Sequence, residues 1–240
     1  MISAEMISAP ALKKSTHRAV APAWHTTVIL VVLLGFSALG AVAGNRLSNG
    51  PLPRIAQYML VIVMEWVLVG FIWSSMGRRG VRMADLIGGR WARPLDVFRD
   101  LGIGIAFIIV GGGALQGLGY LMKAAPNHVL RSILPKNGTE IALWMVMSMT
   151  AGFCEELVFR GYLTRQFAAL TQSAAAGIVL QGIVFGAAHG YQGWKLMLII
   201  TIYGTMFGLL AHWLRSLRPG MIAHFLQDGV GGILGRYIAR

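Results

Sequence analysis

Residues 141–160 read IALWMVMSMTAGFCEELVFR. The stretch carries no charged side chain before residue 155, and then places Glu155, Glu156 and Arg160 close together. An apolar run of about 20 residues is long enough to cross a bilayer as a helix. A charged side chain inside such a run costs about 2.5–3.5 kcal/mol on insertion, so its presence indicates a function. The stretch therefore predicts a membrane helix that carries a polar site.

The rest of the chain has the same apolar character. Of its 240 residues, 56% are hydrophobic and only 12% are charged, and the mean hydropathy is +0.64. A soluble domain carries about 25% charged residues, and a segment in hydrocarbon must be helical to pair its own backbone groups. We therefore predict an all-α, polytopic transmembrane helical bundle of about seven to eight membrane helices. The predicted spans are residues 24–44, 55–75, 101–122, 141–159, 174–189, 196–214 and 221–238, and an eighth short or re-entrant segment is left open.

Positive charge gathers beside the apolar runs. The net charge is +12, and the basic residues are densest in one loop, at Arg78, Arg79, Arg82, Arg90, Arg93 and Arg99. Cytoplasmic loops next to membrane helices carry such an excess, so we expect no nucleic-acid partner. With the N-terminus inside, more than half of the 21 Lys and Arg residues fall on the inner side. We predict a multi-pass protein of the plasma (inner) membrane, in contact with the lipid bilayer, with its N-terminus in the cytoplasm.

Composition divides the chain into three parts. Residues 1–23 form a basic N-terminal tail, residues 24–139 form the N-terminal membrane helices with the basic cytoplasmic loop, and residues 140–240 form a catalytic membrane core. In the first part Lys13, Lys14 and Arg18 precede an apolar run that ends in Ala41-Val42-Ala43. That pattern also occurs in cleaved signal peptides. Because the run is of spanning length, we interpret it as a retained membrane helix.

Glycines stand four residues apart in several of the predicted spans. This spacing is typical of membrane helices that pack closely against one another. We therefore expect a tightly packed bundle. The pairs are Gly40/Gly44, Gly113/Gly117, Gly182/Gly186, Gly204/Gly208 and Gly231/Gly235.

Two adjacent carboxylates in an apolar helix would repel each other, and burial penalises both charges. Arg160 follows Glu156 by four residues, so the two side chains share one helix face and can pair. Glu155 is rotated by about 100° from Glu156 and lacks that partner. We therefore predict that Glu156 is neutralised structurally and that Glu155 is available as a base. The alternative is a helix end at the membrane surface.

Two later spans carry further polar groups. His189 follows Phe185 by one helical turn near the end of the fifth span, and His224 precedes Asp228 by one turn in the last. His224 and Asp228 therefore share a helix face, so the carboxylate can orient the imidazole. The alternatives are a packing or interfacial role for His189, and a self-satisfied His–Asp pair that holds two helices together.

Glu, His, His and Asp on three helices suit two kinds of chemistry. A carboxylate or imidazole can take a proton from water while another group steadies the oxyanion. Glu155, His189, His224 and Asp228 are equally candidates to bind a divalent metal such as zinc, because His and Glu are usual zinc ligands. The soluble zinc-protease motif, with two His around a Glu on one helix, is absent from the sequence. Whether a metal cofactor is present stays open.

With these motifs the chain resembles the CPBP family, the CAAX prenyl protease and Abi-type intramembrane metalloproteases. Members carry Glu-Glu-x-x-x-Arg, then Phe-x-x-x-His, then His-x-x-x-Asn or Asp, on successive membrane helices. The matching residues are Glu155, Glu156 and Arg160, then Phe185 and His189, then His224 and Asp228, and Gly161-Tyr162-Leu163 is also similar to the family. The resemblance covers about residues 140–240.

The resemblance implies a role for each residue. Glu155 and His189 would activate the attacking water, and His224 with the residue at position 228 would stabilise the oxyanion. Glu156 and Arg160 would support this site, with Phe185 beside it. One departure concerns Asp228, where the prenyl-protease members have Asn, because a carboxylate cannot donate a hydrogen bond unless it is protonated. An orienting or metal-binding role for Asp228 therefore stays open.

The preferred hypothesis is an intramembrane endopeptidase that uses Glu/His-activated water. Its substrate would be a peptide or a membrane protein, as in CAAX processing. A second hypothesis is a catalytically silent membrane scaffold or bacteriocin-immunity protein that binds a partner. A third is a proton-coupled carrier, since intramembrane Glu and His also build relays. Carriers commonly contain inverted repeats, and the sequence shows no such symmetry.

Three residues need separate interpretation. Cys154 lies beside Glu155, and we interpret it as a packing residue rather than a nucleophile. Glu65 is a further ionisable residue within a span; it would line the cavity or pair with a loop arginine, and we leave it out of the site. His189 would lie near the opposite membrane face from His224 if every helix were perpendicular. Helix tilt, or continuation of the fourth helix to about Leu170, would reduce that separation.

Overall fold

A computed structural model describes residues 18–46, 52–124 and 128–238 of the chain. Most of the predicted basic tail, including Lys13 and Lys14, lies outside these residues. The described residues form helices and no strand, so the predicted all-α fold is confirmed. The helices are α1 (Ala23–Arg46), α2 (Arg54–Gly77), α3 (Met83–Ile87), α4 (Pro94–Phe107), α5 (Gly113–Leu121), α6 (His128–Ile133), α7 (Gly138–Glu155), α8 (Thr164–Thr171), α9 (Ala174–Ala188), α10 (Trp194–Leu214) and α11 (Arg218–Ile238), with π-helices η1 (Ile108–Gly112) and η2 (Glu156–Leu163) and a 3₁₀ turn η3 (Gly190–Gln192).

Five continuous helices in the described ranges are long and apolar enough to cross a membrane. They are Ala23–Val42, Arg54–Gly77, Pro94–Leu121, Gly138–Thr171 and Trp194–Leu214. The other two predicted spans are also helical, but α9 has only 15 residues, and α11 has 21 residues that include several polar ones. The chain therefore forms an integral membrane bundle, while the number of helices that cross the bilayer completely is not fixed at seven or eight.

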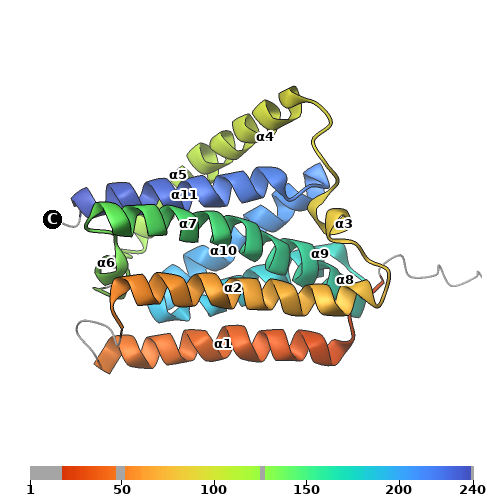
Figure 1. The fold of residues 1–240 in the computed structure, drawn as a ribbon, viewed down its shortest axis with the longest axis horizontal. Helices are drawn as coiled ribbons and strands as arrows, with labels where there is room; N and C mark the ends of the chain where they lie inside the picture. Colours follow the sequence, from red (N-terminus) through yellow and green to blue (C-terminus); the bar gives the residue numbers. More distant parts are fainter. Residues whose placement is uncertain (1–17, 47–51, 125–127, 239–240) are drawn as a thin grey trace, which may run out of the picture.

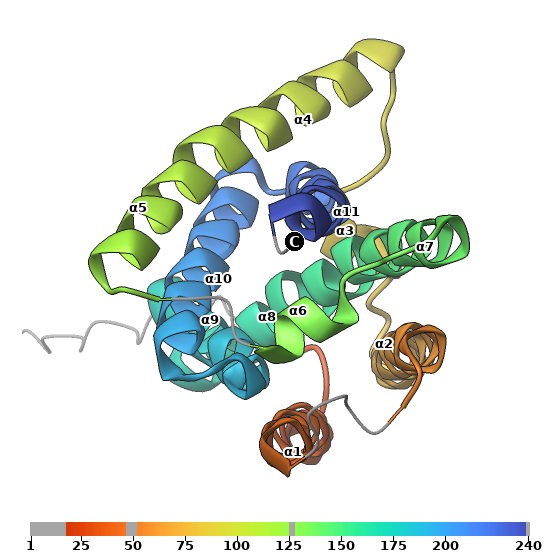
Figure 2. The ribbon, with the colours of Figure 1, turned by 90° about the vertical axis from the view of Figure 1, so that its left-hand side faces the viewer.

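The bundle is built around one long helix, the continuous segment Gly138–Thr171 made of α7, η2 and α8. In Figure 1, α1, α2, α7 and α11 lie nearly parallel. The view along them in Figure 2 has α4, η1 and α5 as a long arm on the outside, next to α10 and α11. Half of the apolar window of Gly138–Thr171 is buried in the bundle, against 11% for the arm. The central helix packs against α2, α9 and α11, and its Glu156 and Arg160 are buried in the bundle.

Glycine spacing brings α9 and α10 together. A Cβ atom added at Gly182 would collide with the side chain of Thr205, and one added at Gly186 would collide with that of Thr201. The close approach predicted from this pair is therefore confirmed. It places the C-terminal half of α9, which carries Phe185, firmly against α10.

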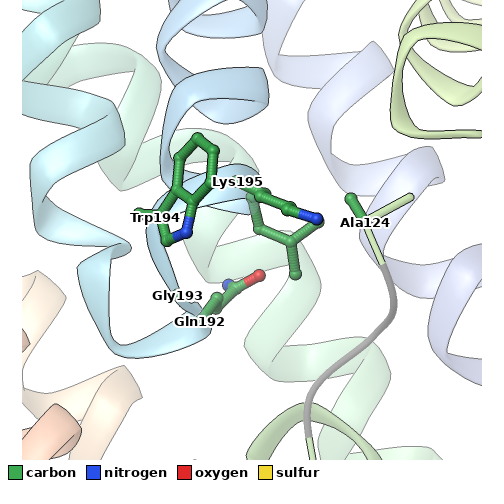
Figure 3. Close-up of a pocket in the computed structure, with 6 residues that line it drawn as sticks. Ala124, Gln192, Gly193, Trp194 and Lys195 are labelled. Carbon is green, nitrogen blue, oxygen red and sulfur yellow. The ribbon is translucent and has the colours of Figure 1, made fainter. Parts of the chain in front are cut away.

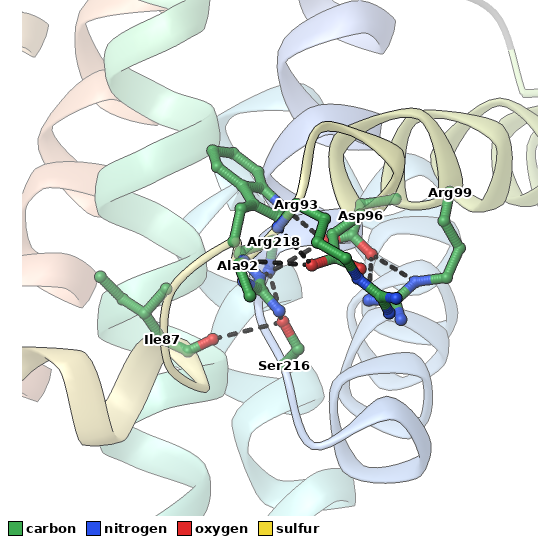
Figure 4. A network of polar contacts seen from close by, with 9 residues as sticks. Ile87, Ala92, Arg93, Asp96, Arg99, Ser216 and Arg218 are labelled. Carbon is green, nitrogen blue, oxygen red and sulfur yellow. Dashed lines mark hydrogen bonds and ion pairs between the residues drawn. The ribbon is translucent and has the colours of Figure 1, made fainter.

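A buried carboxylate fixes the basic loop against the start of α11. Asp100, which is 1% exposed, accepts hydrogen bonds from Trp91 and Arg99 at 2.8 Å each, and Arg218 lies 3.3 Å from it. Figure 4 shows Arg99, Arg218 and Ser216 in this network of polar contacts. Three donors around one buried carboxylate satisfy its charge. The network thereby anchors the helix that carries His224.

Buried polar contacts attach α1 to the central helix. The side chain of Gln166 accepts hydrogen bonds from the backbone N–H groups of Val20 and Ala21, at 2.7 and 3.1 Å. A ring nitrogen of His25 lies 3.2 Å from the hydroxyl of Tyr162. All of these groups are shielded from solvent, so the contacts fix the N-terminal end of α1 on the bundle.

Candidate active site

The central helix changes pitch where its charged residues lie. Residues 156–163 form a π-helix, and all eight are buried. Such segments are rare and occur frequently at functional sites. The helix then continues through α8 to Thr171. This confirms the expected continuation of the fourth helix to about Leu170, although the sequence did not predict the π-helical turn.

The predicted pairing of Glu156 with Arg160 is confirmed. Nη1 of Arg160 lies 3.1 Å from Oε1 of Glu156, and both side chains are 0% exposed. The guanidinium lies between the rings of Phe185 and Phe207, at 4.2 and 4.9 Å from their centroids. Its Nη2 donates a hydrogen bond to the carbonyl of Gly204 at 3.4 Å. A buried ion pair of this kind fixes Glu156 in one position and binds α10 to η2.

The imidazole of His224 lies close to three carboxylates, those of Glu155, Glu156 and Asp228. Its Nδ1 is 3.2 Å from Oε1 of Glu156, and its Nε2 is 3.4 Å from Oδ2 of Asp228 and 3.7 Å from Oε2 of Glu155. Both ring nitrogens therefore face carboxylate oxygens. An imidazole satisfies acceptors on both sides only when both nitrogens carry a proton. This geometry suits a hydrogen-bond donor and not a proton acceptor.

Asp228 lies one turn beyond His224 on α11, as its spacing predicts. Its side chain is 39% exposed, unlike the fully buried Glu156. The carboxylate faces Nε2 of His224, and the backbone carbonyl of the same residue accepts a hydrogen bond from the indole of Trp144 at 2.9 Å. As an acceptor, Asp228 can orient the imidazole.

His189 lies at the C-terminal end of α9, at the edge of this group. Its Nδ1 is 2.8 Å from the carbonyl of Phe185, which can only accept, so in the neutral ring Nδ1 carries the proton and Nε2 is the acceptor. The ring of Phe185 lies 4.8 Å from that of His189 and 6.1 Å from that of His224. Within the described chain, no hydrogen bond or ion pair joins His189 to Glu155 or His224. The structure therefore brings His189 to the site only across Phe185.

A fourth carboxylate, Glu65, which is not among the predicted site residues, is buried on the helix that packs against the central helix. Glu65 on α2 is 8% exposed, its Oε2 accepts no hydrogen bond from a described donor, and Glu155, His224 and Asp228 act on it electrostatically. In the sequence, Glu65 is a carboxylate in the middle of an apolar span with no basic residue close to it. The sequence does not show that α2 packs against α7, so the position of Glu65 relative to the site could not be predicted.

The four candidate metal ligands do not form a metal site in the structure. Over the described ranges, no group of three or more His, Cys, Asp and Glu side chains has a geometry that could hold a metal ion. Glu155 and Asp228 approach His224 directly as ion-pair partners, and His189 lies beyond the ring of Phe185. Zinc binding therefore stays a prediction, which metal analysis of the purified protein tests.

A separate cavity of about 180 Å³ lies where η3 meets α10. Figure 3 shows Trp194 and Lys195 on one side of it, with Ala124 opposite. No candidate catalytic residue lines this cavity, so it is distinct from the carboxylate site. Its lining residues are Ala124, Gln192, Gly193, Trp194, Lys195 and Leu196.

Comparison with known proteins agrees with the motifs. Residues 137–230 match a family model described as type II CAAX prenyl endopeptidase Rce1-like. The chain is 26% identical over 137 residues to the uncharacterized protein YpbD of Bacillus subtilis (strain 168), and the match covers 54% of this chain and 64% of that protein. No solved structure matches the chain. The resemblance expected from the three motifs is thus confirmed over residues 137–230, which are similar to the Rce1-like prenyl endopeptidases.

Proposed function

We propose that this protein is an intramembrane endopeptidase of the CAAX-processing type, which hydrolyses a peptide bond near the membrane with water activated by Glu155. One observation carries the proposal. Glu155 on the central helix and His224 on α11 approach to 3.7 Å inside the bundle. A carboxylate and an imidazole donor at this distance, held by a buried ion pair, suit acyl-transfer chemistry better than packing.

Glu155 is the group best suited to take the proton of the attacking water. Glu156 is occupied by Arg160 and by Nδ1 of His224. The side chain of Glu155 remains 21% exposed, so water can reach it. As water attacks the carbonyl carbon, Glu155 receives its proton, and it later returns that proton to the leaving amine as the C–N bond breaks. General acid–base catalysis of this kind contributes about 10²–10⁴-fold to a rate.

His224 would stabilise the oxyanion that forms as water attacks the carbonyl carbon. Both of its N–H groups face carboxylates in the structure, so the positive charge of the ring, held in place by Asp228, would stabilise the negative charge that a carbonyl oxygen gains. Removing one donor of this kind costs about 2.7–4 kcal/mol of transition-state stabilisation in other hydrolases. Asp228 thus takes an orienting role, which its carboxylate can perform without being protonated.

His189 offers a second proton acceptor. Because Nδ1 is bound to the carbonyl of Phe185, Nε2 is free to accept in the neutral ring. We propose that His189 assists Glu155 once a substrate and water occupy the space beside Phe185. For this, the ring of Phe185 would have to move, because it packs against the rings of both His189 and His224.

The distribution of charge supports an orientation. In Figure 1 the start of α1, α3 and the start of α4 lie at the same end of the bundle. Exposed arginines of the basic loop, such as Arg82 and Arg93, lie at this end. Cytoplasmic faces carry this excess. We propose that this end faces the cytoplasm of a cell bounded by a plasma (inner) membrane, with the N-terminus on that side.

The proposal is tested with a quenched fluorogenic peptide that ends in a farnesylated CAAX sequence, together with the same peptide without farnesyl. Purified protein in proteoliposomes should cleave the farnesylated peptide, with the product identified by mass spectrometry. Glu155→Ala, His189→Ala and His224→Ala should each abolish cleavage.

Folding of each variant is checked by size-exclusion chromatography and thermal unfolding. Glu140→Gln serves as a matched control, because Glu140 pairs with Arg54 at 3.0 Å and does not contact the site. Full activity of the Glu155→Ala protein would contradict the proposal. Binding without cleavage by the wild type, unchanged in all three variants, would favour the scaffold hypothesis.

A further inference from the structure

Three arginines that take no part in the proposed reaction lie at one end of the bundle. Arg79 follows the end of α2, Arg82 is the N-cap of α3, and Arg165 lies on α8. Figure 1 shows the end of α2, α3 and α8 at the same end of the molecule as the start of α1. We call Arg79, Arg82 and Arg165 the basic corner.

Hydrogen bonds to the backbone fix two of these guanidinium groups. Arg79 donates from Nη1 to the carbonyl of Ala19 at 3.2 Å, and the two residues after Ala19 donate backbone hydrogen bonds to the side chain of Gln166. Arg165, which precedes Gln166 in the chain, donates from Nη2 to the backbone carbonyl of Asp85 at 2.8 Å. Both guanidinium groups are therefore held in place by the segments that surround them.

The basic corner carries more positive charge than its carboxylate balances. Asp85 forms an ion pair with Arg82 at 3.1 Å, and these two side chains are 47% and 80% exposed. In the ranges that the structure describes, no carboxylate forms an ion pair with Arg79 or Arg165, and each donates only to a neutral carbonyl. A guanidinium group has five N–H donors, so both arginines keep donors for a further acceptor. Their charge and geometry suit an anionic ligand.

Two exposed tryptophans place the basic corner at the level of lipid headgroups. Trp73 on α2 is 65% exposed and precedes Arg79 by six residues, and Trp24 at the start of α1 is 56% exposed. The ring of Trp24 lies 6.2 Å from that of Phe71, so both tryptophans belong to the same end of the bundle. Tryptophans of membrane proteins gather at the interface between hydrocarbon and water. A guanidinium group just beyond them is therefore at the height of phosphate groups.

We propose that the basic corner binds the headgroup of an anionic phospholipid, whose phosphodiester accepts hydrogen bonds from Arg79 and Arg165. The planar guanidinium group suits two phosphate oxygens at once, and basic residues beside membrane helices attract anionic lipids. A zwitterionic lipid would bring an ammonium group that the arginines repel, so the site should discriminate between the two lipids. The occupant is a lipid and not free phosphate, because Trp24 and Trp73 place its acyl chains beside the bundle. This inference does not depend on peptide cleavage.

Native mass spectrometry in a mild detergent, with added phosphatidylglycerol or phosphatidylcholine, tests the proposal. The wild type should bind phosphatidylglycerol at least about tenfold more tightly than phosphatidylcholine. The double variant Arg79→Gln/Arg165→Gln should bind phosphatidylglycerol about thirtyfold more weakly than the wild type, or about 2 kcal/mol, as expected for two basic side chains near an anionic group. Arg79→Lys/Arg165→Lys keeps both charges and should stay within about fivefold of the wild type.

Arg236→Gln is the matched control, because Arg236 also donates to a backbone carbonyl, that of Lys136 at 3.3 Å, but lies near the end of α11. It should leave lipid binding unchanged. Thermal unfolding checks each variant, and if the double Gln variant does not fold, Arg79→Gln alone should bind about fivefold more weakly.

Three results would overturn the proposal. The first is equal binding of both lipids by the wild type. The second is a loss in Arg236→Gln as large as that in the folded Arg79 and Arg165 variants, or no loss in those variants. The third is displacement of phosphatidylglycerol by inorganic phosphate at constant ionic strength, which would assign the basic corner to free phosphate.

Discussion

The substitution Glu156→Gln should destabilise the protein by several kcal/mol. It keeps the size of the side chain but removes the charge that faces Arg160. With an effective dielectric constant of about 20, unit charges 3.1 Å apart attract each other by about 5 kcal/mol. Both side chains are 0% exposed, so solvent screening does not reduce this value. Breaking a buried pair by removing one partner typically costs about 3–5 kcal/mol, and we expect a loss in that range.

Equilibrium unfolding in mixed micelles, followed by tryptophan fluorescence, measures this loss for Glu156→Gln, for Arg160→Met and for the double variant. Removing both charges leaves no unpaired buried ion. The double variant should therefore lose less free energy of unfolding than Glu156→Gln alone, with a coupling energy of about 2–3 kcal/mol.

The result that would refute this reasoning is a loss below about 1 kcal/mol for Glu156→Gln, the value typical of exposed ion pairs. Strictly additive losses in the double variant would equally show that the two groups do not depend on each other. In either case Glu156 would not be held by Arg160, and the argument that leaves Glu155 as the base would fail.

Three further predictions follow from the packing. Gly186→Val should destabilise the bundle by more than about 3 kcal/mol and abolish cleavage, because the new side chain would collide with Thr201. Gly113→Ala should change stability by less than about 0.5 kcal/mol, since nothing lies within 4 Å of it. Thermal unfolding in detergent compares the two variants. Cys154→Ser should retain cleavage of the farnesylated peptide, because the thiol is fully buried and serves in packing, and complete loss by a folded variant would favour a nucleophile. Gln166→Ala should lower the free energy of unfolding by about 1–3 kcal/mol, because buried backbone N–H groups lose their acceptor, and limited proteolysis should cut the N-terminal segment faster.

The membrane helices could be predicted because hydropathy and length are local properties of the chain. All seven predicted ranges coincide with helices. The two that fall short of spanning criteria do so for physical reasons. Helix α9 ends at Ala188, before the 3₁₀ turn that begins at Gly190, and α11 carries His224 and Asp228, which lower its hydropathy.

Contacts within one helix were also predictable, and contacts between helices were not. The spacing of Glu156 and Arg160 gave their ion pair, because residues four apart share a helix face. The approach of His224 to Glu155 was only a hypothesis, since it depends on the packing of α11 against α7. Which helix Glu65 faces depends on packing between helices, and residues 156–163 carry no spacing from which we predicted their π-helical turn.

The most direct test of the central claim is the cleavage rate of Glu155→Gln against the wild type, on one peptide and in one membrane. Gln keeps the shape of the side chain and its contacts but cannot accept a proton. If Glu155 is the base, kcat/KM should fall by at least about 10²-fold, while unfolding temperature and peptide binding stay unchanged. Cleavage by Glu155→Gln within a few-fold of the wild-type rate would contradict the claim.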